Sequence, residues 1–250
     1  MMQWYGVGTS HQGLVRPTNQ DVFLVENELQ LWAVADGMGG HPGGDVASRL
    51  VIDSIAGRAR QKAIHLQGRT EQGELVLREM IESAHHAILD HSRRHPGLAG
   101  MGTTLTLLHI SSQPFPVATI INEGDSRAYL LRNSALTQLT RDHSMVEEYI
   151  EQGLLSVEQA LHHPQRHVLS RAVGLGPRSD ADVRTHRLEP SDLLMLCTDG
   201  LTKMVEDAHI ESTMNASLHD PDAACRALLI AALDAGGIDN ITAVVLSVRA

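Results

Sequence analysis

Five aspartates of the chain sit at the ends of short apolar runs, where their carboxylates could act together. Asp36, Asp125 and Asp199 follow runs of strand length, whereas Asp21 and Asp239 precede such runs. In an antiparallel sheet the carboxyl end of one strand lies beside the start of its neighbour, so all five carboxylates could line one edge. Clustered carboxylates repel one another unless cations neutralise them, and oxygen ligands suit Mg²⁺ or Mn²⁺ better than zinc. The pattern predicts a centre for two divalent cations.

Glycines accompany these aspartates. Gly37, Gly124 and Gly200 each adjoin one of them, and Gly237 lies two residues before Asp239. Glycine lets the backbone turn tightly and approach a ligand. Asp-Gly pairs also occur in ordinary turns, so one pair alone predicts no site. Several pairs in register with apolar runs favour ligand binding.

The elements that must position these residues can be read from the same runs. Apolar stretches bounded by Gly, Pro, Asn or Asp predict strands at 22–25, 31–35, 104–110, 117–121, 193–197 and 241–248. Helical spacing of apolar residues predicts helices through Ala47–Ile55 and Leu77–Ile88, and Asp220 with Pro221 begins a third that Gly236 and Gly237 end. The order lacks the steady strand-helix alternation of a parallel sheet. We therefore expect an α+β fold, an antiparallel β-sandwich with helices outside it.

We expect one domain over residues 1–250, because a chain of 250 residues with 42% hydrophobic composition can bury a large single core. The segment 143–187 departs from the strand pattern and is interpreted as a flap. Its His162, His163, Arg166 and His167 could touch a partner, but plain surface exposure is the favoured reading.

Bulk composition excludes several classes of protein. The net charge of -10 and the lack of any Lys/Arg block argue against a nucleic-acid partner. Cys197 and Cys225 are the two cysteines, too few and too isolated for a disulfide framework or a thiolate zinc site. The chain has no signal-like N-terminus and no apolar run of membrane-spanning length. We expect a cytoplasmic, monomeric protein with no membrane partner.

Eight short motifs then add a family resemblance. The chain resembles the metal-dependent protein phosphatases of type 2C (PPM), in their short bacterial form, from about residue 6 to about residue 248. The motifs follow the family's order: R-P-T-N-Q-D at 16–21, D-G-M-G-G-H at 36–41, G-T-T at 102–104, G-D-S-R at 124–127, D-H-S at 142–144, R-A-V-G at 171–174, T-D-G-L at 198–201 and D-N-I-T at 239–242.

The resemblance implies a sandwich of two antiparallel sheets flanked by helices on both outer faces, and it assigns metal ligands. Asp36 would bridge two Mn²⁺ or Mg²⁺ ions, the Gly37 carbonyl would complete the shell of one, and Asp199 and Asp239 would hold the other. Asp125, shared with Asp199, resembles the family's ligand for a third and weaker metal ion.

The resemblance also implies the reaction, which is hydrolysis of phosphoserine and phosphothreonine in proteins. Arg16 resembles the arginine that grips the substrate phosphate, a task its planar fork suits. A hydroxide bridging two cations would attack phosphorus in line with the departing oxygen. Cys197 lies inside an apolar run without the loop of a cysteine phosphatase, so we expect it to be buried core.

Two positions depart from eukaryotic relatives. Gln20 stands where they have a metal-binding Glu, so Asp21 would carry more of that role, and Met38 replaces a His thought to protonate the leaving group. His41 is near and could be a donor or a structural loop residue. We favour a metal-bound water as the acid.

Two other classes of function stay open. A pseudophosphatase would keep the fold and bind phosphoproteins or a kinase, but the complete set of Asp36, Asp199 and Asp239 weighs against it. A structural cation-binding protein leaves Arg16 and the flap without a role. The expected partners are phosphorylated protein substrates of serine/threonine kinases.

Overall fold

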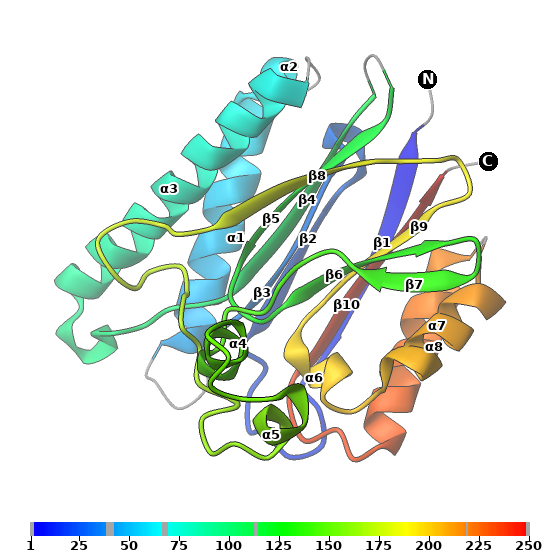
Figure 1. The fold of residues 1–250 in the computed structure, drawn as a ribbon. Coiled ribbons are helices and arrows are strands. Elements are labelled where there is room, and N and C mark those ends of the chain that lie inside the picture. The colour runs from blue at the N-terminus through cyan, green and yellow to red at the C-terminus, as the bar shows by residue number, and fades with distance from the viewer. Residues whose placement is uncertain (1–2, 39–42, 67–69, 113–114, 219, 249–250) are drawn as a thin grey trace.

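A computed structural model describes residues 3–38, 43–66, 70–112, 115–218 and 220–248. Its framework is a pair of five-stranded antiparallel sheets (Figure 1). One sheet has the order β1 (Trp4–His11), β10 (Ile241–Val248), β9 (Leu193–Cys197), β6 (Arg127–Arg132), β7 (Ala135–Gln138). The other has the order β2 (Asp21–Glu26), β3 (Leu31–Asp36), β4 (Leu105–Ser111), β5 (Val117–Glu123), β8 (Asp182–Arg187).

Helices cover the outer face of each sheet (Figure 1). The β2–β8 sheet carries α1 (Gly44–Gln61), α2 (Ala63–Leu66) and α3 (Thr70–Arg94), and the β1–β7 sheet carries α6 (Asp199–Thr202), α7 (Asp207–Ala216) and α8 (Pro221–Asp234). Short 3-10 turns occupy Asn27–Leu29 and Pro96–Leu98. The four layers confirm the predicted α+β sandwich with helices on both outer faces.

Side-chain alternation along β3 explains the layering. Leu31, Ala33 and Ala35 pack with the α1 and α3 side chains, while Trp32 and Val34 point to the apolar layer between the sheets. Successive residues of a strand face opposite sides, so a strand buried on both faces is apolar throughout. Asp36, the last residue of β3, is where this apolar run ends and the polar edge begins.

All six predicted strands are present, and the predicted α8 starts as expected. Asp220 caps α8 by accepting a hydrogen bond from the Ala223 N–H at 2.9 Å. Four further strands, β1, β6, β7 and β8, were not predicted. Pairing of β1 with β10 joins the two ends of the chain in one sheet.

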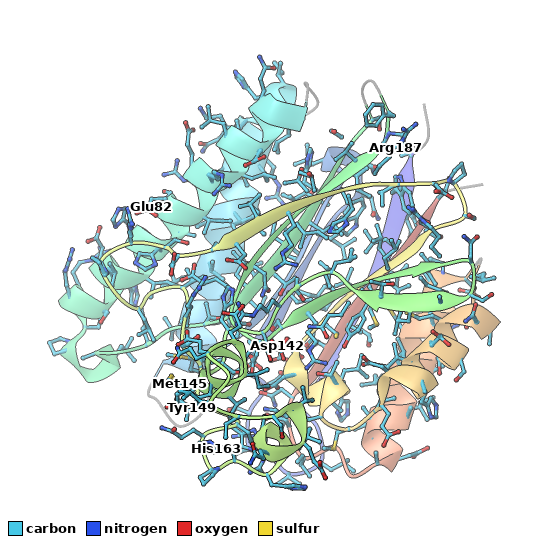
Figure 2. All side chains as sticks on the ribbon, in the orientation of Figure 1. Glu82, Asp142, Met145, Tyr149, His163 and Arg187 are labelled. Carbon is cyan, nitrogen blue, oxygen red and sulfur yellow. The ribbon has the colours of Figure 1, made fainter. Side chains whose placement is uncertain are left out.

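The predicted flap contains α4 (Met145–Glu151) and α5 (Val157–Leu161), which lie below the sheets in Figure 2. The Tyr149 ring of α4 meets the ring of His163, two residues after α5, edge-on at a centroid distance of 5.8 Å. Its predicted end at residue 187 is wrong. Residues 182–187 form β8, which pairs with β5, because an exposed edge strand can be polar and lacks the apolar signature of a core strand.

Two contacts fix the base of the flap. Arg127 of β6 donates from Nε and Nη2 to the carboxylate of Asp142, at 2.9 and 2.8 Å, just before the flap begins. The Met145 N–H donates to the Val168 carbonyl at 2.9 Å, which closes the segment on itself.

Within the described part of the chain, no helix has the length and apolar composition to cross a membrane.

Candidate metal centre

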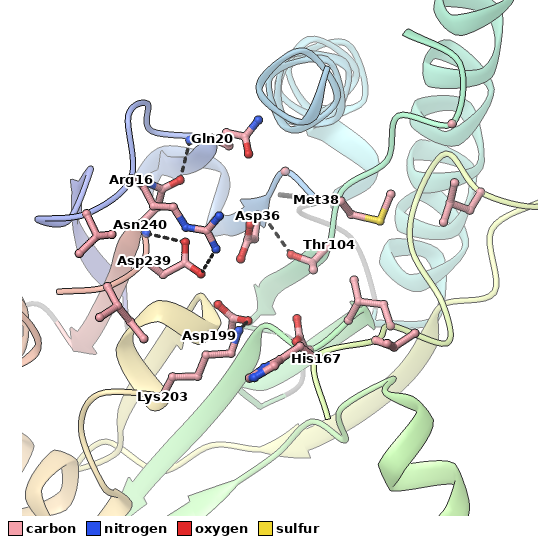
Figure 3. A pocket seen from close by; sticks show the side chains of 18 residues that line it. Arg16, Gln20, Asp36, Met38, Thr104, His167, Asp199, Lys203, Asp239 and Asn240 are labelled. Carbon is pink, nitrogen blue, oxygen red and sulfur yellow. Dashed lines mark hydrogen bonds and ion pairs between the residues drawn. The ribbon is translucent and has the colours of Figure 1, made fainter. Parts of the chain in front are cut away.

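The ends of the central strands open into a cavity of about 930 Å³. Four of the five predicted aspartates line it, together with Arg16 and Gly37. Asp36 comes from the end of β3, and Asp199 from the start of α6 (Figure 3). Asp125 lies between β5 and β6, and Asp239 lies just before β10. The antiparallel arrangement thus gathers aspartates that are up to 203 positions apart in the chain, from Asp36 to Asp239.

Backbone contacts hold Asp36 in place. Its N–H donates to Thr104 Oγ1 at 2.9 Å, and its carbonyl accepts from Thr103 Oγ1 at 2.8 Å. The next residue must be glycine, because a Cβ on Gly37 would lie 2.1 Å from the carbonyl oxygen of Gly44. The chain therefore turns sharply after β3, and the Asp36 carboxylate is left to face the cavity.

Asp199 is the first residue of α6, and its two carboxylate oxygens differ. Oδ2 forms an ion pair with Lys203, while Oδ1 is buried and has no hydrogen-bond partner among the described residues. Gly200 packs directly on the loop before β10, since a Cβ there would lie 1.8 Å from the carbonyl oxygen of Asn240. This contact sets Asp199 beside Asp239.

Asp239 is paired with Arg16, whose Nη2 donates to its Oδ2 at 2.8 Å. The other oxygen accepts the Asn240 N–H at 2.9 Å. Asn240 also fixes the loop that carries Arg16, because its Nδ2 donates to the carbonyls of Gln12 and Thr18 at 2.8 and 2.9 Å. The predicted phosphate-binding arginine therefore lies at the cavity mouth, 43% exposed, with one edge of its guanidinium against a carboxylate.

Asp21 differs from the other four. It is opposite Asp36 in the β2–β3 register, yet it is not among the residues that line the cavity. Its Oδ2 accepts hydrogen bonds from Thr198 Oγ1 and Thr242 Oγ1, both at 2.8 Å. Burial raises the pKa of this carboxyl to about 7. In this structure Asp21 supports the junction of β9 and β10 from behind the cavity.

Carboxylates are crowded around the cavity. Burial first, and then the neighbouring carboxylates, raise the pKa of Asp36 and of Asp125 well above the usual range. The carboxylates outnumber the two cations that contact them, Arg16 and Lys203. Such an excess of buried negative charge is costly unless further cations are bound.

The residues present fit divalent cations. The donors are oxygens, which are the preferred ligands of Mg²⁺ and Mn²⁺. Asp199 Oδ1 is buried without a hydrogen-bond partner, and a bound cation could take that place. Within the described ranges, no three Asp, Glu, His or Cys side chains already surround a single point. Asp199 and Asp239 each pair one oxygen with a basic side chain (Figure 3).

Three residues that line the cavity were not among the predicted site residues. Lys203, Thr104 and His167 all line the cavity. Lys203 follows Asp199 by four residues, a helical ion-pair spacing that could have revealed it. His167 is exposed, as expected, and it also lies at the cavity wall beside Lys203 (Figure 3), whereas His162, His163 and Arg166 are not among the lining residues.

The two departures noted in the sequence also lie here. Gln20 and Met38 both line the cavity. His41 lies outside the described residues. Cys197 is fully buried in β9, and burial raises the pKa of its thiol to about 12, which confirms its role as a core residue.

Comparison with known proteins agrees with this geometry. The family model for protein phosphatase 2C matches residues 7–229. The serine/threonine phosphatase stp of Listeria monocytogenes is 36% identical over 234 residues, covering 92% of this chain and 90% of that protein. The solved catalytic domain of the serine/threonine protein phosphatase PstP, in complex with two manganese ions, superposes with a TM-score of 0.85 at 31% identity and full coverage of both chains.

A further solved structure, the serine/threonine phosphatase of S. agalactiae, has a TM-score of 0.87 at 28% identity, covering 98% of this chain and 100% of that one. This chain belongs to the protein phosphatase 2C family of metal-dependent serine/threonine phosphatases. The predicted family, enzyme class and dependence on Mn²⁺ or Mg²⁺ are confirmed.

Proposed function

We propose that this enzyme removes phosphate from phosphoserine and phosphothreonine residues that serine/threonine kinases have modified in bacterial proteins. The observation that carries the proposal is the gathering of Asp36, Asp199, Asp239 and Arg16 around one cavity. Carboxylates on one side bind cations, and a guanidinium at the mouth binds the phosphate of an incoming side chain.

Each site residue has a proposed role. Asp36 would serve as a ligand to both divalent cations, and the Gly37 carbonyl would help to hold one of them. Asp199 and Asp239 would hold the other cation, and Asp125 with Asp199 would hold a weaker third. When bound, the metal ions supply a nucleophile from water near neutral pH and offset charge on the phosphate oxygens.

The chain's own groups orient the substrate. Arg16 uses one edge of its guanidinium on Asp239 and keeps other N–H groups for phosphate oxygens. Thr104 anchors the Asp36 backbone, so the carboxylate is fixed before substrate arrives. Asp21, Thr198 and Thr242 brace the strands that carry Asp199 and Asp239. Met38 cannot donate a proton, so we assign protonation of the leaving oxygen to water.

Hydrolysis of a phosphothreonine peptide tests the proposal. Activity should require Mn²⁺ or Mg²⁺ and disappear with a chelator, and Asp36→Asn and Asp239→Asn should each lower kcat by about 100-fold or more. Asp53→Asn, the same change on an exposed part of α1, is the matched control and should keep full activity. Activity that survives chelation or either site substitution would refute a metal centre held by these aspartates.

Arg16 can be tested separately. Arg16→Lys keeps the charge but loses the planar fork, so KM for the peptide and the inhibition constant of inorganic phosphate should both rise about tenfold. An unchanged inhibition constant would remove Arg16 from the phosphate site.

The remaining proposals concern the protein as a whole. We propose that residues 1–250 form one domain, supported by the pairing of β1 with β10. We also propose that the enzyme is a cytoplasmic monomer. Light scattering coupled to gel filtration tests the monomer, and cell fractionation tests the compartment.

A further inference from the structure

Lys203 stands out because the chain contains only two lysines and eighteen arginines. The other lysine, Lys62, is exposed at the end of α1. Lys203 instead lines the cavity, where its ammonium pairs with Asp199 Oδ2. Its side chain is 30% exposed and that of Asp199 is 12% exposed, so the pair is largely withdrawn from water.

The local backbone builds this pair. Asp199 begins α6, and the Lys203 N–H donates to the Asp199 carbonyl at 2.8 Å, which places the two side chains on the same side of one helical turn. The ion pair between Lys203 and Asp199 therefore depends on the local backbone of residues 199–203.

The Lys203 ammonium lies among carboxylates, as a bound metal cation would. Burial lowers the pKa of its amine, but Asp199, Asp125 and Asp239 outweigh that effect and raise it. Among these carboxylates, Asp199 Oδ1 is buried and has no hydrogen-bond partner among the described residues. An ammonium at this place neutralises the same oxygens that a divalent cation would use.

We propose that Lys203 is a built-in counter-cation, which pairs with Asp199 in the metal-free enzyme and must leave that oxygen when a divalent cation binds. Lysine suits such exchange, because it carries a compact charge on a flexible stem. The pair stabilises the metal-free fold and lowers the affinity of the metal site that Asp199 shares with Asp125. The inference rests on the proposed metal ligands.

Mn²⁺ binding to the metal-free protein, measured by isothermal titration calorimetry, tests it without any assay of activity. Lys203→Met keeps the length of the side chain and removes the charge, so the weakest Mn²⁺ site should bind about tenfold more tightly. Lys203→Arg keeps the charge and should resemble the wild type. Lys62→Met, the same change at the other lysine, is the matched control and should alter nothing.

Selective labelling gives a second readout that needs no variant. An amine-reactive ester followed by mass spectrometry should label Lys62 readily and Lys203 poorly in chelator, and the Lys203 fraction should rise severalfold when Mn²⁺ is added. Unchanged Mn²⁺ affinity in Lys203→Met, or labelling of Lys203 that ignores Mn²⁺, would overturn the inference. A higher KM for phosphopeptide with unchanged Mn²⁺ affinity would instead make Lys203 a substrate contact. A wild-type chain that binds no Mn²⁺ would overturn the proposed metal ligands themselves.

Discussion

Replacement of Gly200 by alanine should damage the metal centre without touching any of its ligands. The new Cβ would lie 1.8 Å from the carbonyl oxygen of Asn240 and 2.9 Å from its carbonyl carbon. Both are backbone atoms, so no side-chain rotation can relieve the contact. The loop before β10 must therefore move away from α6.

The size of the effect follows from this distance. A Cβ atom essentially never lies within 3.0 Å of such a neighbour, so the separation must grow by more than an ångström. Asp239 precedes Asn240 and Asp199 precedes Gly200, so the shift falls directly on two proposed ligands. A misplacement of about 1 Å can cost about 100-fold in rate, and the strain should cost about 1–3 kcal/mol of stability.

Peptide hydrolysis at saturating Mn²⁺, Mn²⁺ titration and urea unfolding together measure the outcome. Gly57→Ala is the matched control, because its Cβ meets nothing within 4 Å and it lies inside α1. That change should keep activity and add about 0.5–1 kcal/mol of stability. If Gly200→Ala matches the wild type in rate and Mn²⁺ affinity, tight packing of α6 on the β10 loop does not position these ligands.

Three further changes address stability. Burial lowers the pKa of His109 to about 4, so unfolding takes up a proton between about pH 6.5 and 4. The free energy of unfolding should therefore fall by up to about 3 kcal/mol as the pH falls through that window. A His109→Gln variant with the same pH profile of urea unfolding would contradict this. Thr242→Val removes one of the two hydroxyls that donate to buried Asp21 and should cost about 1–3 kcal/mol in urea unfolding, whereas no loss would mean that the remaining hydroxyl suffices. Asp220→Ala removes the α8 cap and should lower stability by about 1 kcal/mol with unchanged kcat, a result that a drop in kcat would disprove.

The core strands could be predicted because burial on both faces makes them apolar runs. β1 could not, since its Gly6 and Gly8 make room for the rings of Trp32 and Phe23, and a Cβ there would lie 2.3 and 2.5 Å from ring atoms. Only the neighbouring strand explains such glycines. The β6–β7 hairpin had a readable signal in Asn133, which has a positive φ of 52° together with the next residue at 65°.

The candidate site was partly predictable for a similar reason. A carboxylate at the end of an apolar strand is visible in the sequence, so the positions of Asp36 and Asp199 followed from pattern and family resemblance. Side-chain partners depend on register between strands that are distant in the sequence. The hydrogen bonds that Asp21 accepts from Thr198 and Thr242 therefore had no sequence signal.

The arrangement also links metal dependence to stability. Strand ends and tight glycine turns hold Asp36, Asp199 and Asp239 in place, so the carboxylates cannot separate to relieve their repulsion. Arg16 and Lys203 offset only part of that charge. A cation that binds the folded chain and not the unfolded one adds about 2.7 kcal/mol of stability at 100 times its dissociation constant. The geometry that prepares the centre for phosphate chemistry is thus the same geometry that makes the fold more stable when its cations are bound.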